Sequence, residues 1–208
     1  MKPNANNILK NLRSLLFCFA FLSPLFAFSC VKAEKSGGFD VPGFSDETAE
    51  AGQIIFEANK DLTKIKILYK ENEDKGEELK RALETDDADL VRKISDEVVD
   101  LINDGADSGK SAIKKIQAAQ EMEINEDYRK YLSLKEESLT KQLEAFANYQ
   151  QAAIALRDNY DPKNKLLREK IKEEFKTRSE NYRIIMEKAR EYSTRANELA
   201  KESAKKQN

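Results

Sequence analysis

Residues 103–115, NDGADSGKSAIKK, place two glycines before a lysine and a serine, an order typical of a phosphate-binding loop. Such a loop needs four residues between its glycines, because its backbone N–H groups must wrap around the phosphates. Here only three residues separate Gly105 from Gly109, and Asp104 and Asp107 would repel a phosphate. The residues that precede the segment have helical periodicity, not the strand that the motif requires. The sequence therefore predicts an irregular point in a helix and no nucleotide site.

The same stretch places Asp100, Asp104 and Gly105 at the first, fifth and sixth places of a calcium-binding loop. The third place is Ile102 and the twelfth is Ser111, where such a loop needs an oxygen ligand and a bidentate glutamate. The chain has no histidine, the commonest general base and zinc ligand. We therefore predict no metal site, no cofactor and no enzymatic activity.

The two cysteines, Cys18 and Cys30, lie near the N-terminus. Residues 1–13 carry three basic and no acidic side chains, and an uncharged apolar run follows over residues 15–30. This order is typical of a secretory signal peptide, and the run is shorter than the roughly 20 residues of a membrane-spanning helix. We predict a signal peptide over residues 1–29.

The end of this run, Ala27-Phe28-Ser29-Cys30, resembles the lipobox of bacterial lipoproteins. The resemblance implies that Cys30 carries a diacylglycerol, with acyl chains such as palmitate, and becomes the first residue of the mature protein. Ala27 and Phe28 depart from the residues commonest at those places, and the resemblance covers residues 1–30 alone. The alternative is secretion without a lipid, with cleavage after Ser29 or Ala33. No family is identified for the helical part of the chain.

Residues 30–44 mix glycine, proline, serine and charges without periodicity, which predicts a flexible tether that starts at the lipidated Cys30. Cys18 leaves with the signal peptide, so the mature chain forms no internal disulfide. Two acyl chains give stable anchoring. The chain is therefore expected to be exported and anchored to a bacterial membrane, at the outer membrane or cell surface rather than the inner membrane.

From residue 45 onward apolar residues recur at alternate steps of three and four, which predicts coiled-coil-like amphipathic helices. Charged residues make up 36% of the chain, with only 7 glycines and 4 prolines, as in long helices. Turn and cap residues, among them Ser45 before the first helix and Asp161 with Pro162 at the first position of the fourth, divide the pattern. The expected helices span about 46–83, 87–122, 126–159 and 162–204.

Short connections between long helices favour an all-α, elongated antiparallel up-down four-helix bundle over residues 45–208. The second helix is predicted to continue through Gly105 and Gly109, and a break at residues 103–109 is the alternative. Certain polar residues lie on or beside the apolar stripes, where they set the register or line the edge of the seam: Asn72, Lys135, Gln142 and Arg178.

Charge is unevenly distributed. Residues 162–208 hold 14 basic and 8 acidic side chains, which predicts a basic last helix among acidic neighbours or, alternatively, a basic face for anionic lipid or polysaccharide. Residues 71–89 hold nine acidic and three basic side chains at the expected turn between the first two helices. That turn and the one near Tyr160 would lie together at the end far from the anchor. Possible partner contacts at this tip are Glu77, Glu78, Asp86, Asp87 and Tyr160; the alternative is a solvated tip without a partner.

These patterns together predict a membrane-anchored lipoprotein of the cell envelope with a non-catalytic helical interaction or structural module. Its expected partners are membrane lipid, through the acylated Cys30, and a protein that the sequence does not identify. A surface adhesin or ligand-binding lipoprotein and a periplasmic chaperone-like holder are the alternatives. An exported chain of acidic balance is not expected to bind nucleic acid.

Overall fold

The computed structural model describes residues 46–206, in which every regular element is a helix. The four helices are α2 (Asp46–Glu84), α3 (Ala88–Gln120), α4 (Glu126–Asn159) and α5 (Lys165–Lys206). The predicted signal peptide, Cys30, the tether and the Ser45 cap lie outside the described residues.

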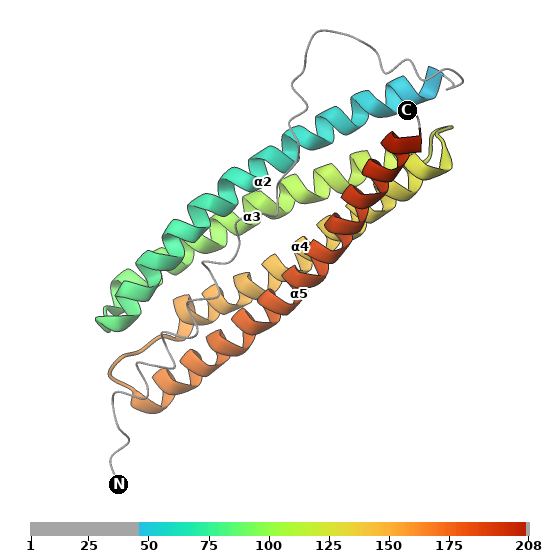
Figure 1. Cartoon of the computed structure of the whole chain (residues 1–208). Coiled ribbons are helices and arrows are strands. Elements are labelled where there is room, and N and C mark those ends of the chain that lie inside the picture. The colour runs from blue at the N-terminus through green and yellow to red at the C-terminus, as the bar shows by residue number, and fades with distance from the viewer. Residues whose placement is uncertain (1–45, 207–208) are drawn as a thin grey trace.

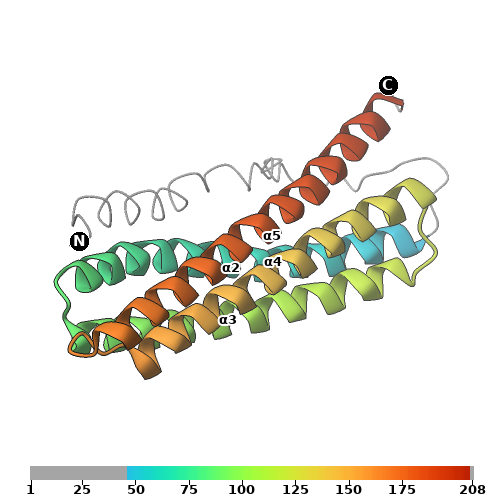
Figure 2. The ribbon, with the colours of Figure 1, turned by 90° about the horizontal axis from the view of Figure 1, so that it is seen from below.

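The helices alternate in direction and run alongside one another as an elongated bundle (Figure 1). α2 packs along α3, α3 along α4, and α4 along α5. Among the described residues α2 and α5 share no comparable backbone packing, so the α2–α5 side is the loosest of the bundle. The last turns of α5 diverge from the other helices (Figure 2). The predicted all-α antiparallel four-helix bundle is confirmed.

The apolar stripes form the core. In α2, Ala51, Ala58 and Ile65 are at most 2% exposed, whereas Ile55 and Leu62 of the same seam are only half-buried. The three buried residues are spaced seven apart, as expected for the centre of a seam. The half-buried pair lies on the α2 flank that no other helix fully covers.

The ends of the helices follow their capping residues. Asp87 accepts a hydrogen bond from the backbone N–H of Leu90 at 3.0 Å, and α3 begins directly after it. In the same way Asn125 accepts from the N–H of Tyr128 at 2.7 Å and precedes α4. Side chains that accept from the free N–H groups of a first turn stabilise a helix start by about 1 kcal/mol.

The predicted start of the fourth helix at Pro162 is wrong, because α5 begins at Lys165. Asp161 accepts from the N–H of Lys163 at 2.9 Å and so closes a turn instead of capping the helix. Asn164 is the residue that accepts from the first turn, from the N–H of Leu167 at 3.1 Å. The second helix also ends earlier than predicted, at Gln120 instead of about residue 122.

α3 is continuous through both of its glycines, so the alternative with a break at residues 103–109 is wrong. The two glycines differ in their surroundings. A Cβ added at Gly109 would lie 2.5 Å from Cδ2 of Leu143, whereas one added at Gly105 would meet only Cδ1 of Leu68, at 4.0 Å. Gly109 therefore permits the close approach of α4, and Gly105 does not serve this purpose.

We expect Gly105→Ala to raise the free energy of unfolding by about 0.5–1 kcal/mol, because alanine restricts the unfolded chain and fits the helix. Gly109→Ala should be less stable than Gly105→Ala by about 1 kcal/mol, since Leu143 must move to admit the methyl group. Urea unfolding followed by circular dichroism measures both. Equal gains from the two substitutions would contradict the close approach at Gly109.

Candidate functional site

The end of the bundle that holds the α2–α3 turn also holds the connection between α4 and α5, as the sequence predicted. The Tyr160 hydroxyl donates to Oδ1 of Asp86 at 2.6 Å, and Nη1 of Arg168 lies 3.1 Å from Oδ2 of the same carboxylate. Lys172 approaches it at 3.9 Å. Asp86 has a φ of 52°, a left-handed conformation that aspartate tolerates better than most residues. Asp86 therefore joins the two turns.

The other predicted tip residues divide into two groups. Tyr160 is 4% exposed, and burial together with the hydrogen bond to Asp86 raises its pKa. Asp87 caps α3, so both side chains maintain the tip itself. Glu77 and Glu78 lie within α2, where they form local ion pairs with lysines and keep about half of their side-chain surface exposed, 57% and 42%. Glu77 and Glu78 are the two that present carboxylates to solvent without a cap or inter-helix role.

An aromatic cluster joins α2, α4 and α5 near the middle of the bundle. The Tyr149 ring lies 5.6 Å from that of Tyr182 and 6.3 Å from that of Phe175, between ring centroids. Tyr69 contacts Phe146 at 6.3 Å, and the Tyr182 hydroxyl donates to the Tyr69 hydroxyl at 3.3 Å. Burial is the main reason that the pKa values of Tyr69, Tyr149 and Tyr182 are raised. This cluster fills the core and connects the two sides of the loose α2–α5 seam.

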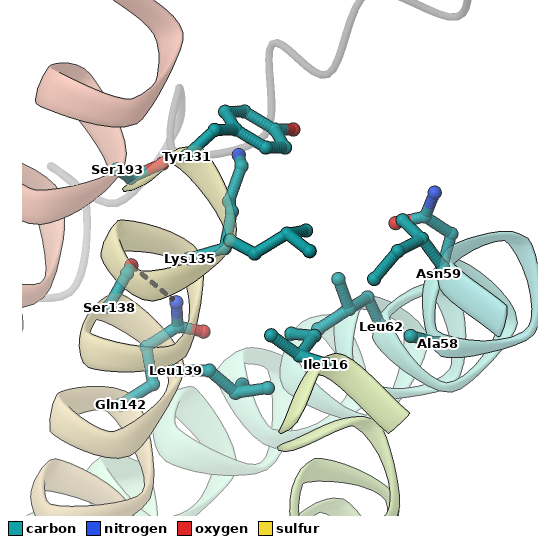
Figure 3. Close-up of a pocket in the computed structure, with 12 residues that line it drawn as sticks. Ala58, Asn59, Leu62, Ile116, Tyr131, Lys135, Ser138, Leu139, Gln142 and Ser193 are labelled. Carbon is teal, nitrogen blue, oxygen red and sulfur yellow. Dashed lines mark hydrogen bonds between the residues drawn. The ribbon is translucent and has the colours of Figure 1, made fainter. Parts of the chain in front are cut away.

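A groove follows on the α2–α5 side, toward the end where α2 begins. Figure 3 shows Ala58, Asn59 and Leu62 of α2 facing side chains of α4 across this space, with Ile116 of α3 between them. The cavity within this groove is about 30 Å³, room for only one or two water molecules. The lining residues are Ile55, Ala58, Asn59, Leu62, Ile116, Tyr131, Leu132, Lys135, Ser138, Leu139, Gln142 and Ser193.

Among the described residues, Lys135 is the one charged side chain that lines this groove. Its ammonium donates to Oδ1 of Asn197 at 3.3 Å and lies 5.5 Å from the centroid of the Tyr131 ring. Burial lowers the pKa of Lys135 from 10.5 to about 8, because the charged form loses part of its hydration. Next to it, Gln142 donates to Ser138, which in turn donates to the backbone carbonyl of Ala189 on α5.

The sequence indicated Lys135 and Gln142 as polar interruptions of a stripe, but it did not place them in a groove. The sequence pattern showed that both residues lie on the stripe of one helix, but it could not show which residues of α2 face them across the groove. A buried carboxylate, that of Asp61, accepts from Ser111 and Lys115 at 2.7 Å each. Desolvation acts to raise the pKa of Asp61, but these hydrogen bonds outweigh it and lower the pKa. Asp61 therefore joins α2 to α3 and is satisfied within the bundle.

Residues 46–206 hold no group of three or more residues suited to binding a metal ion. No helix within that range is both long and apolar enough to cross a membrane. Comparison with protein-family models, curated protein sequences and solved structures found no match.

Proposed function

We propose that this chain is a membrane-anchored lipoprotein of the bacterial cell envelope, and that its bundle is a non-catalytic interaction or structural module. The observation that carries the proposal is the sequence Ala27-Phe28-Ser29-Cys30 at the end of an uncharged apolar run. A diacylated Cys30 would hold the protein at a membrane, because two acyl chains bind stably where one binds only marginally.

The bundle geometry gives the anchored protein a proximal and a distal end. α2 contains 39 residues, which corresponds to about 58 Å at 1.5 Å per residue. A lipid attached before α2 would leave the tip with Asp86 and Tyr160 as the distal end, with Glu77 and Glu78 on its solvent face. The groove around Lys135 would lie in the half nearer the anchor.

We expect Cys30→Ala to move most of the protein from the membrane fraction to the soluble fraction of cells, because the acyl acceptor is lost. Cys18→Ala is the matched control, since that cysteine lies inside the predicted signal peptide and should leave anchoring intact. Membrane fractionation and the mass of the mature N-terminus measure the result. Membrane association that survives Cys30→Ala, with no acyl mass on the N-terminus, would overturn the anchor.

Protease treatment of intact cells, with a periplasmic protein as control, decides between the surface and the periplasm. Digestion of the bundle in intact cells would favour the adhesin or ligand-binding alternative. Protection until the outer envelope is opened would favour an envelope partner or a chaperone-like role.

A further inference from the structure

We propose that the outer face of the first half of α2 lies against a bilayer that contains anionic phospholipid. This α2 outer face consists of Phe56, Lys60, Lys64, Ile67 and Lys70. The proposal rests on the lipid anchor proposed above, which would hold α2 close to a membrane, and it adds a second contact between the protein and that membrane.

The five residues form one stripe on the side of α2 that faces away from the core. They follow one another at steps of three or four residues, which places them on one side of a helix. The stripe lies opposite Ala58 and Ile65, which are at most 2% exposed. Among the described residues α2 packs extensively against α3 alone, and all five side chains of the stripe are exposed.

Two large apolar side chains of the stripe lie in water. Phe56 is 61% exposed and Ile67 is 56% exposed, and they are separated by about three turns of helix. The Lys60 ammonium lies 4.9 Å from the centroid of the Phe56 ring. Apolar side chains flanked by lysines are typical of helices that lie in a membrane interface, where the apolar groups enter the headgroup boundary and the ammonium groups stay in water beside the phosphates.

The charge of α2 reverses halfway along the helix. Residues 56–70 hold four lysines and two acidic side chains, and one of these, Asp61, is buried and hydrogen-bonded to α3. Residues 71–84 hold six acidic and three basic side chains. An anionic surface therefore attracts the first half of α2 and repels the second half. The contact would leave the acidic tip of the bundle in water.

α5 is the more basic helix by composition, but it presents no comparable face. Several of its arginines pair with acidic side chains one turn away: Arg183 with Glu180 and Glu187, and Arg178 with Glu174. Acidic and basic groups therefore alternate on the surface of α5. Over residues 56–70 of α2, by contrast, Glu57 is the one exposed acidic residue, and it pairs with Lys60.

The length of the chain before α2 permits this contact. Fifteen residues, 31–45, separate Cys30 from α2, and a chain of that length spans at most about 50 Å. Ile67 lies about 32 Å along α2 from its first residue, at 1.5 Å per residue. The lipid on Cys30 can therefore remain in the bilayer while the whole α2 outer face lies on the bilayer surface.

The test is tryptophan fluorescence of the lipidated protein, reconstituted in vesicles of equal parts phosphatidylcholine and phosphatidylglycerol with brominated acyl chains as the quencher. The chain has no tryptophan, so Phe56→Trp introduces a single fluorophore into the α2 outer face. Bromine should reduce the fluorescence of Phe56→Trp at least twofold. Leu166→Trp is the matched control, because Leu166 is 85% exposed at the tip end of the bundle and should be quenched little.

The lysines are tested with two triple variants of equal charge in the Phe56→Trp protein. The first removes three charges from the α2 outer face: Lys60→Gln, Lys64→Gln and Lys70→Gln. The second removes three exposed charges from α5: Lys170→Gln, Lys176→Gln and Lys188→Gln. The first should reduce the quenching at least threefold, and the second should leave it unchanged. Circular dichroism of each variant confirms that the bundle is folded.

Three results would overturn the proposal. The first is quenching of Phe56→Trp that is no greater than that of Leu166→Trp. The second is equal quenching in brominated phosphatidylcholine alone or equal loss of quenching in the two triple variants, which would show a contact without selection for anionic lipid. The third is a blue-shifted emission of Phe56→Trp in detergent that grows with protein concentration, which would show that a second copy of the chain covers this face.

Failure of the anchor gives a different result, because the protein then does not float with the vesicles in a sucrose gradient. Brominated vesicles are in that case added in excess to the soluble protein, and the same comparison of variants is made. Quenching of Phe56→Trp that needs the α2 lysines would support the α2 contact without the anchor, and its absence would overturn the contact as well.

Discussion

Tyr149→Ala is expected to lower the free energy of unfolding by about 4 kcal/mol, the largest loss from a single side chain in this bundle. Tyr149 is 1% exposed and is the largest of the fully buried side chains in the described part of the chain. Its ring packs against Phe175 and Tyr182 of α5, so alanine would leave a cavity at the centre of the α4–α5 interface. Aromatic pairs of this geometry add about 0.5–1.5 kcal/mol beyond the area that they bury.

Urea unfolding followed by circular dichroism measures this loss. Tyr192→Ala on α5 is a suitable control, because Tyr192 is only half-buried and its ring contacts the exposed Arg195. The control should lose about 1 kcal/mol or less. Similar losses for the two substitutions would show that the aromatic cluster is not the centre of the core.

The loss at Tyr149 also bears on the groove. Tyr182 is the residue that both packs on Tyr149 and donates to Tyr69 of α2, so it connects α2 to α5 where the backbones do not pack together. Without the Tyr149 ring, Tyr182 loses the contact that holds its own ring in place for the hydrogen bond to Tyr69. The α2–α5 side should then open first, which native-state hydrogen exchange would detect as faster exchange in α2 than in α3.

The sequence predicted the helices and most of their buried positions because these depend on local patterns. The apolar residues at steps of three and four identified the core face, which holds Ala51, Ala58 and Ile65. The sequence placed the fourth helix start too early because Asp161 and Asn164 are both good capping residues. Which of the two caps the helix depends on the path of the connection between α4 and α5. The hydrogen bond between Tyr160 and Asp86, which are 74 residues apart in the chain, holds the start of that connection.

The groove could not be predicted for a related reason. A seam shows that Ile55 and Leu62 face other helices, but not that α2 and α5 lack extended packing. Similarly, Lys135 could be placed on a stripe, but whether its ammonium reaches water depends on where α5 and α2 lie. The cost of a buried charge is a property of the assembled bundle and is not visible in one helix.

We expect Lys135→Met to raise the free energy of unfolding at pH 7 by about 2 kcal/mol. The pKa of Lys135 is about 8 in the folded protein, against 10.5 for a lysine in water, as in the unfolded chain. A difference of one pKa unit between the two states corresponds to about 1.4 kcal/mol. The full difference would give about 3 kcal/mol, and loss of the Asn197 and Tyr131 contacts offsets part of it. Methionine retains the apolar stem and adds no charge.

The gain should depend on pH with a definite sign. Below pH 8 the amine is protonated in both states, so the folded protein bears the whole cost of burying the charge. Between pH 8 and 10.5 the folded state releases this proton first, so the wild-type protein gains stability as pH rises and the advantage of Lys135→Met shrinks. Asn59, Ser193 and Asn197, which approach from α2 and α5, do not titrate, and burial raises the pKa of Tyr131.

Denaturant unfolding of both proteins from pH 7 to pH 10 measures this trend, with Lys130→Met as a surface control that should stay within about 0.5 kcal/mol of wild type. A gain that is absent at pH 7, or that grows with pH, would contradict a desolvated lysine. The combination of results separates two roles for Lys135. A lysine that sets the register of the helices would lose stability on substitution, whereas a lysine whose charge is costly to bury should make the bundle more stable when methionine replaces it.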